Sequence, residues 1–241
     1  MTDATPTTTP SKAGLWEDFI DIFYQPSAVF ERRRDGQFGL ALLILVVLST
    51  VLYFALRNGL APIIDAELSR QIAAMAEKNP QLTEEQLAGS KSMMEKFAAF
   101  GTVIFVPLGI LITAALLWLA GRLVEAKIAF AAAMMIATYS QVPKLGELIL
   151  NALQGLLLAP EAITSRYSVS IGIARFLDPD TNPVVLTVVG GLDVFTIWTV
   201  VLMAIGLSVV GRIPLQRAAI AAAAVWFVGM IPALFQAIQQ S

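Results

Sequence analysis

Long, nearly uncharged apolar stretches, separated by short polar segments, make up most of this chain. Four of them predict transmembrane helices over residues 38–57, 97–121, 184–210 and 218–238, because about 20 apolar residues in an α-helix cross the hydrocarbon core of a bilayer. A fifth span is expected over residues 143–160, where the pattern is less regular. The pattern therefore predicts an all-α fold, a polytopic transmembrane helical bundle of about five spans.

The region of residues 128–159 allows three interpretations. Its two apolar halves are each short for a span, and Lys144 and Glu147 lie between them. It is one long span kinked at Pro143, a short in-plane helix followed by a span that begins near Pro143, or a re-entrant hairpin of two half-spans. We favour the second interpretation, which gives the count of five.

Between the first two predicted spans, residues 58–96 have the pattern of two amphipathic helices. Apolar residues recur at helical spacing as far as an Asn79-Pro80 break, which is a turn signal. Thr83 and Gln86 then match a capping box at the start of the second helix. We expect a helical hairpin outside the membrane, on the side opposite the N-terminus.

The N-terminal segment, residues 1–37, is expected to be a cytoplasmic tail followed by an amphipathic helix. Residues 1–13 are rich in Thr, Pro and Ser and are predicted to be disordered. The helix begins near Leu15, ends at Pro26, and places its aromatic residues on one face and Glu17, Asp18 and Asp21 on the other. It lies on the membrane interface or packs against the bundle, and three arginines supply the positive charge that its acidic face lacks. The candidate interface residues are Trp16, Phe19, Ile20, Phe23, Arg32, Arg33 and Arg34.

Lysines and arginines near the span ends indicate the orientation of the chain. Three arginines precede the first span, and the tight loops at residues 122–127 and 211–217 hold two basic residues each. The hairpin at residues 58–96 also contains lysines and arginines, which argue against placing it on the far side. Because the rule holds best for short loops, its length makes this counter-argument weaker. We expect the N-terminus and both tight loops in the cytoplasm and the C-terminus on the far side.

Composition excludes several function classes. Neither cysteine nor histidine occurs, which removes disulfides, Cys/His zinc sites, thiol nucleophiles and Ser-His triads. The net charge is −2 and no basic patch is visible, so nucleic acid is not an expected partner. We predict no enzymatic activity, no catalytic or metal-binding residues and no cofactor.

Asp193 lies inside the predicted span of residues 184–210, where a charge costs at least about 2.5–3.5 kcal/mol near the bilayer centre. In one hypothesis Asp193 pairs with Lys144 and locks two spans together. In the other, Gly190 and Gly191 loosen the helix, and the freed carbonyls and the carboxylate line a polar pocket, as in transporters with broken helices. The candidate intramembrane polar cluster consists of Tyr139, Gln141, Lys144, Glu147 and Asp193.

Three features in this order resemble the Yip-one (Ypt/Rab-interacting protein, Yip/YIPF) family. They are the aromatic-acidic N-terminal segment with Phe19 and Pro26, the Ala-Thr-Tyr-Ser-Gln-Val-Pro run of residues 137–143, and Phe195-Thr-Ile-Trp198 followed by Leu202 and Gly206. The resemblance implies a Yip-like transmembrane domain over residues 38–241, with five spans and a cytoplasmic N-terminus. In eukaryotic members it implies a role in membrane traffic through small GTPases and protein partners.

Two departures limit what the resemblance implies. The N-terminal segment is shorter than in eukaryotic members, and the hairpin at residues 58–96 is not a feature of them, which puts binding of a small GTPase in doubt. The alanine-rich, cysteine-free composition favours a bacterial plasma membrane over a Golgi or endoplasmic reticulum membrane.

We therefore expect a membrane scaffold or adaptor that acts through residues 16–34. Its expected partners are the lipid bilayer, other membrane or peripheral proteins, and a second copy of the chain in a homo-oligomer. The alternative is a transporter or channel for a small molecule, ion or lipid, with a polar site between the third and fourth spans.

Overall fold

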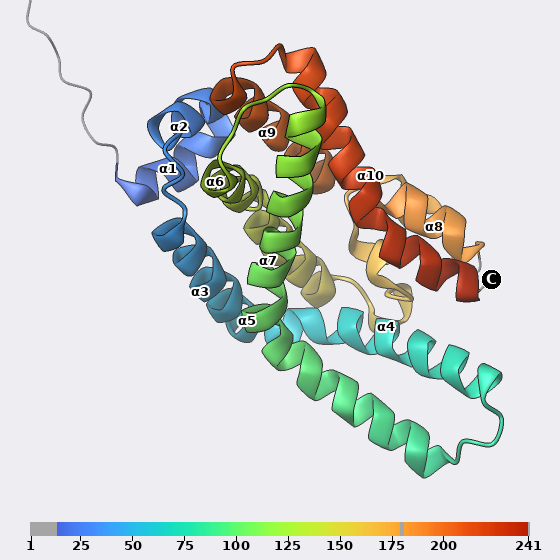
Figure 1. Ribbon diagram of the computed structural model, residues 1–241. Coiled ribbons are helices and arrows are strands. Elements are labelled where there is room, and N and C mark those ends of the chain that lie inside the picture. The colour runs from blue at the N-terminus through green and yellow to red at the C-terminus, as the bar shows by residue number, and fades with distance from the viewer. Residues whose placement is uncertain (1–13, 179–180, 241) are drawn as a thin grey trace, which may run out of the picture.

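The computed structural model describes residues 14–178 and 181–240, and this part of the chain forms a helical bundle (Figure 1). The predicted disordered tail, residues 1–13, lies outside the described residues. Apart from one antiparallel bridge between Gly172 and Asp193, the described elements are α- or 3-10 helices. The predicted all-α fold is confirmed.

Two short helices at the N-terminus pack across one end of the bundle. Helix α1 (Leu15–Tyr24) ends before Pro26, as predicted. The same proline is the first residue of α2 (Pro26–Arg32), a helix that the sequence analysis did not predict. Proline is well tolerated there because the first turn of a helix needs no intrahelical N–H donor. Helix α2 packs against α9, where the Phe30 ring lies over Gly206.

The first apolar helix and the hairpin follow. Helix α3 (Gly39–Ala55) meets α4 (Arg57–Lys78) at a bend of 86°. Helix α5 (Glu84–Leu123) begins at the predicted capping box, in which the Gln86 N–H donates to the Thr83 hydroxyl at 3.3 Å. Figure 1 shows the first part of α5 turning away from the bundle beside α4, so the predicted helical hairpin is present.

The ambiguous central region forms the middle of the bundle. Helix α6 (Phe130–Ser140) is buried at every position from 132 to 140 and packs against α5 and α9. A short turn separates it from α7 (Pro143–Leu157), which packs against α4. Residues 132–140 of α6 are therefore enclosed by the bundle on all sides. How this region crosses the membrane stays a prediction.

The predicted fourth span is two helices rather than one. Helix α8 (Pro183–Gly190) and helix α9 (Val194–Gly211) are separated by residues 191–193. Three 3-10 turns, Pro160–Ala162, Arg166–Val169 and Ile173–Phe176, connect α7 to α8. Helix α10 (Leu215–Gln240) packs against both α8 and α9.

Three stretches of the described helices are long and apolar enough to cross a membrane: Gly101–Leu123, Val194–Gly211 and Leu215–Gln239. The bent pair of α3 and α4 would add a fourth, so the count of five stays a prediction. Figure 1 shows α1, α2 and the turns after α5 and after α9 at one end of the bundle, with the α3–α4 bend at the other. This arrangement places the N-terminal helices beside the two tight loops that carry basic residues.

Candidate functional site

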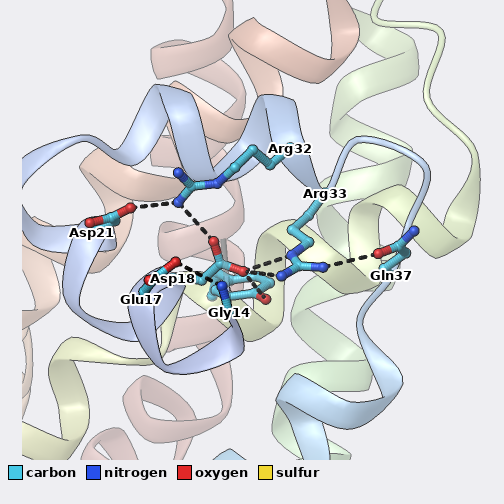
Figure 2. Close-up of polar contacts among 8 residues, drawn as sticks. Gly14, Glu17, Asp18, Asp21, Arg32, Arg33 and Gln37 are labelled. Atoms are coloured by element: carbon cyan, nitrogen blue, oxygen red, sulfur yellow. Dashed lines mark hydrogen bonds and ion pairs between the residues drawn. The ribbon is translucent and has the colours of Figure 1, made fainter. Parts of the chain in front are cut away.

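A buried carboxylate joins the two N-terminal helices to the bundle. Asp18 on α1 has 0% of its side chain exposed and lies between two arginines of the α2 end (Figure 2). Arg32 Nη2 donates to Asp18 Oδ1 at 2.8 Å, and Arg33 Nε donates to Oδ2 at 2.7 Å. The Tyr139 hydroxyl of α6 donates to Oδ2 at 3.3 Å. We call Asp18, Arg32, Arg33 and Tyr139 the N-terminal cluster.

The predicted division of α1 into an apolar and an acidic face is wrong. Asp18, expected on the open polar face, is enclosed together with Phe19 and Ile22. The helix is rotated so that this acid points into the bundle, because two guanidinium groups and a phenol are there to bind it. A buried charge is tolerated only when it is paired in this way.

The three arginines do not provide the free positive charge predicted for them. Arg32 also binds Asp21 at 2.6 Å, and Arg34 binds Glu31 at 2.7 Å. Burial lowers the pKa of Arg32, but its hydrogen bonds to Asp21 and Asp18 outweigh burial and hold this pKa above its ordinary value. Each arginine of the triplet is therefore matched to an acid of the same segment.

The opposite side of α1 is apolar and open. We call it the α1 face, and its exposed fractions are 61% for Trp16, 62% for Ile20, 41% for Phe23 and 80% for Tyr24. Three of these were predicted as interface residues, whereas Phe19 is buried against Tyr139, with the ring centroids 6.1 Å apart. The sequence analysis did not select Tyr24.

A second polar cluster lies where α7 meets the break before α9. Lys144 Nζ forms an ion pair with Glu147 Oε2 at 2.6 Å and donates to the Thr196 hydroxyl at 3.0 Å. That hydroxyl in turn donates to Asp193 Oδ2, and Asp193 Oδ1 accepts from the Phe195 and Thr196 N–H groups. We call Lys144, Glu147, Asp193 and Thr196 the cavity cluster.

Asp193 acts in this structure as the N-cap of α9. A carboxylate is well placed there, because it accepts from otherwise unpaired N–H groups and faces the positive end of the helix dipole. The described ion pairs do not include the predicted one between Asp193 and Lys144; the Thr196 hydroxyl bridges the two charged groups instead. This bridge explains how an acid inside an apolar stretch is accommodated.

The cavity cluster borders a cavity of about 490 Å³ between α5, α7, α9 and α10. Gln141, in the turn before α7, and Asn151, on α7, extend the polar lining, and neither amide has a hydrogen-bond partner among the described residues. Trp226 and Met230 of α10 supply apolar walls. Cavities of a few hundred Å³ with a small number of convergent polar groups are typical of small-molecule sites.

The loop between α7 and α8 lines part of this cavity through Arg166, Tyr167 and Ser170. Gln154 Nε2 donates to the Val169 carbonyl at 2.7 Å, and the Val194 N–H donates to the Ile171 carbonyl at 3.1 Å. These bonds hold the Tyr167 ring against Gly190, where an added Cβ would lie 2.2 Å from Cε1. Gly190 thus lets the loop approach the end of α8. Tyr167 also borders a smaller cavity of about 150 Å³ toward α4.

The structure separates the five residues of the predicted intramembrane cluster. Gln141, Lys144, Glu147 and Asp193 line the same cavity, whereas Tyr139 points away and belongs to the N-terminal cluster. Thr196, Asn151 and Arg166 also line the cavity and were not predicted. The helical spacing of Lys144, Glu147 and Asn151, which places them on one face of α7, was the available signal for Asn151.

No group of three or more acidic, His or Cys residues suited to a metal ion is found in the described part of the chain. No match was found among curated proteins or among solved structures. A family model described as "Yip1 domain" matches residues 20–235. This match covers the cavity cluster, the N-terminal cluster except Asp18, and the apolar helices as far as residue 235. The chain therefore belongs to the Yip1 domain family as a multi-pass integral membrane protein.

Proposed function

We propose that this protein is a Yip-type membrane scaffold that recruits other membrane or peripheral proteins through the α1 face. In this proposal the α1 face is cytoplasmic, in a bacterial plasma membrane or, in a eukaryote, in a Golgi or endoplasmic reticulum membrane. The observation that supports it is an open aromatic helix face on a helix whose other side is fixed in the core. A face held in this way loses little conformational freedom when a partner binds.

Charge favours a protein over the lipid surface as the occupant of this face. Between residues 14 and 37, five carboxylates and three arginines leave two negative charges. Because the arginines are paired internally, none remains to attract anionic lipid headgroups, which interfacial helices bind through lysines and arginines. A partner with an apolar centre and a basic rim would match the α1 face and its acidic surroundings.

The test is co-purification from native membranes with full-length Trp16→Ala/Ile20→Ser/Phe23→Ser. This triple variant changes three of the four residues of the α1 face, all but Tyr24, and leaves the Asp18 contacts in place. We expect it to lose the proteins that co-purify with the wild type. The control is Ile173→Ser/Phe176→Ser, which changes similarly exposed apolar residues in the loop between α7 and α8.

An unchanged set of co-purified proteins in the triple variant would refute the scaffold proposal. Quenching of Trp16 fluorescence by brominated lipids, with no effect of the triple variant on co-purification, would assign the α1 face to the bilayer interface instead.

A second candidate function, transport of a small molecule, ion or lipid, is supported by the cavity at the helix break before Asp193. Asp193→Asn is a suitable test, because asparagine caps a helix about as well as aspartate and so keeps α9 intact. We expect this variant to lose flux in liposomes with little loss of stability. Equal flux in variant and wild type would exclude a role of the Asp193 charge in transport.

A further inference from the structure

We propose that the cavity binds a small zwitterion, a molecule with a primary ammonium and an anionic group, at the Lys144–Glu147 pair. The inference deepens the second candidate function and rests on the same cavity. It concerns binding, so it stands or falls separately from transport.

The charges around the cavity are balanced. The described lining holds two cationic side chains, Lys144 and Arg166, and two carboxylates, Glu147 and Asp193. A ligand with a net charge would leave one charge without compensation in a site of low dielectric, which is costly. A ligand whose own charges cancel avoids this cost and still pairs with both signs.

The Lys144–Glu147 pair has bonding capacity left on both partners. An ammonium has three N–H donors, and Lys144 donates one to the Thr196 hydroxyl. Its contact with Glu147 Oε2 is an ion pair of 2.6 Å, in which that oxygen accepts no hydrogen bond from the described residues. Glu147 Oε1 has no partner among the described residues, and the two side chains are 35% and 27% exposed. At least one N–H group and one carboxylate oxygen therefore remain, next to each other, for an anionic group and an ammonium.

Asp193 is less available, because its two oxygens already accept from Phe195 and Thr196. This difference assigns the ammonium of the ligand to Glu147 rather than to Asp193.

The remaining lining groups fit the same ligand. Asn151 lies on α7 with Lys144 and Glu147, and Gln141 lies in the turn before this helix. Both line the cavity, and their free amides offer donors and acceptors to either end of the molecule. Arg166 lies where the cavity meets the smaller cavity toward α4. Its guanidinium is a second donor group for a carboxylate or phosphate.

Two sources supply this chemistry: a free amino acid and the ethanolamine headgroup of a lipid. The test is calorimetric titration of the full-length protein in nanodiscs of phosphatidylglycerol, which has no ammonium. Glycine and glycerophosphoethanolamine are the zwitterionic probes. Ethanolamine and glycerol phosphate each carry one of the two charges, and sorbitol carries none. We expect either zwitterion to bind at least about tenfold more tightly than the other three.

A nanodisc arm distinguishes the two sources. If the natural ligand is a lipid headgroup, adding phosphatidylethanolamine to the nanodisc weakens the apparent affinity for the soluble probe. If the natural ligand is a free solute, the affinity does not change. Either result is compatible with the proposed ligand chemistry.

The variant Lys144→Met/Glu147→Leu removes both charges together, so that neither is left unpaired in the cavity. We expect zwitterion binding to fall by at least about tenfold. The matched control is Glu31→Leu/Arg34→Met, which removes another ion pair of the same i, i+3 spacing outside the cavity and should leave binding unchanged.

Three results would overturn the inference: no probe binds the folded wild type at millimolar concentration, a singly charged or neutral probe binds as tightly as the zwitterions, or the Lys144/Glu147 variant binds normally. Zwitterion binding without flux in liposomes would leave the ligand assignment in place and exclude transport.

Discussion

The N-terminal cluster and the cavity cluster both contain charged side chains and a hydroxyl group, but they differ in burial. In the first, one carboxylate is enclosed by two arginines and a tyrosine, and none of its side chain is exposed. In the second, lysine, acid and threonine form a chain of contacts that borders an open cavity. Closed clusters fix helices to one another, whereas open ones retain unused donors and acceptors. Burial of the charged groups therefore distinguishes a structural contact from a binding site better than residue type does.

The largest expected effect comes from opening the closed cluster. Asp18→Ala leaves Arg32 and Arg33 without their shared acid and removes the main polar link between α1 and α2. Breaking a buried pair from one side costs about 3–5 kcal/mol, and we expect this loss in the free energy of unfolding in detergent, followed by circular dichroism. Asp35→Ala, an exposed acid of the same segment, is the control. A loss below about 1 kcal/mol would mean that the cluster does not anchor the N-terminal helices.

The second-largest loss of stability is expected from removing the Thr196 bridge in the cavity cluster. Thr196→Val removes the hydroxyl that joins Lys144 to Asp193. Hydrogen bonds to charged groups contribute about 1.5–3 kcal/mol, so we expect a loss of about 2 kcal/mol in the same unfolding measurement. Thr199→Val, whose hydroxyl donates only to the Phe195 carbonyl, should lose less. Equal losses in the two variants would show that the bridge adds nothing to stability.

A smaller effect is expected at the edge of the closed cluster. Tyr139→Phe removes one donor to Asp18 but leaves both arginines in place. The expected loss is about 1 kcal/mol, measured by thermal unfolding with Tyr53→Phe as the control. A loss as large as that of Asp18→Ala would mean that the tyrosine, and not the arginine pair, holds the acid.

The smallest effect on stability is expected where the cluster is open. Lys144→Met/Glu147→Leu removes a partly exposed ion pair, and such pairs contribute about 0–1 kcal/mol. The unfolding midpoint in denaturant should therefore stay close to that of the wild type, although ligand binding is lost. A destabilisation comparable to that of Asp18→Ala would remove the distinction between the two clusters.

Local signals in the sequence predicted the helix ends well. Pro26 separates α1 from α2, Asn79 ends α4, and the Thr83–Gln86 capping box begins α5. Each of these depends on neighbouring residues only, because caps and proline act within one helical turn. The break before Asp193 was also expected from Gly190 and Gly191, although not as the end of a separate helix.

The environment of Asp18 could not be predicted in the same way. Leu15, Asp18, Phe19 and Ile22 have helical spacing as good as that of the aromatic face, but the acid made this alternative look unfavourable. Its partners lie 14, 15 and 121 positions away in the sequence, beyond the reach of local patterning. For the same reason Tyr139 was assigned to the cavity, although its side chain points to the other cluster.

The position of the N-terminal helices in the bundle also has a consequence for folding during synthesis. Helix α2 packs against α9, so a segment that is synthesised early needs one that is synthesised much later to complete its contacts. At about 5–20 residues per second, the delay is on the order of ten seconds. The Asp18 pairs with Arg32 and Arg33 lie within the N-terminal segment, so they are available throughout this delay. The contacts between α2 and α9 can then form only after α9 has been inserted.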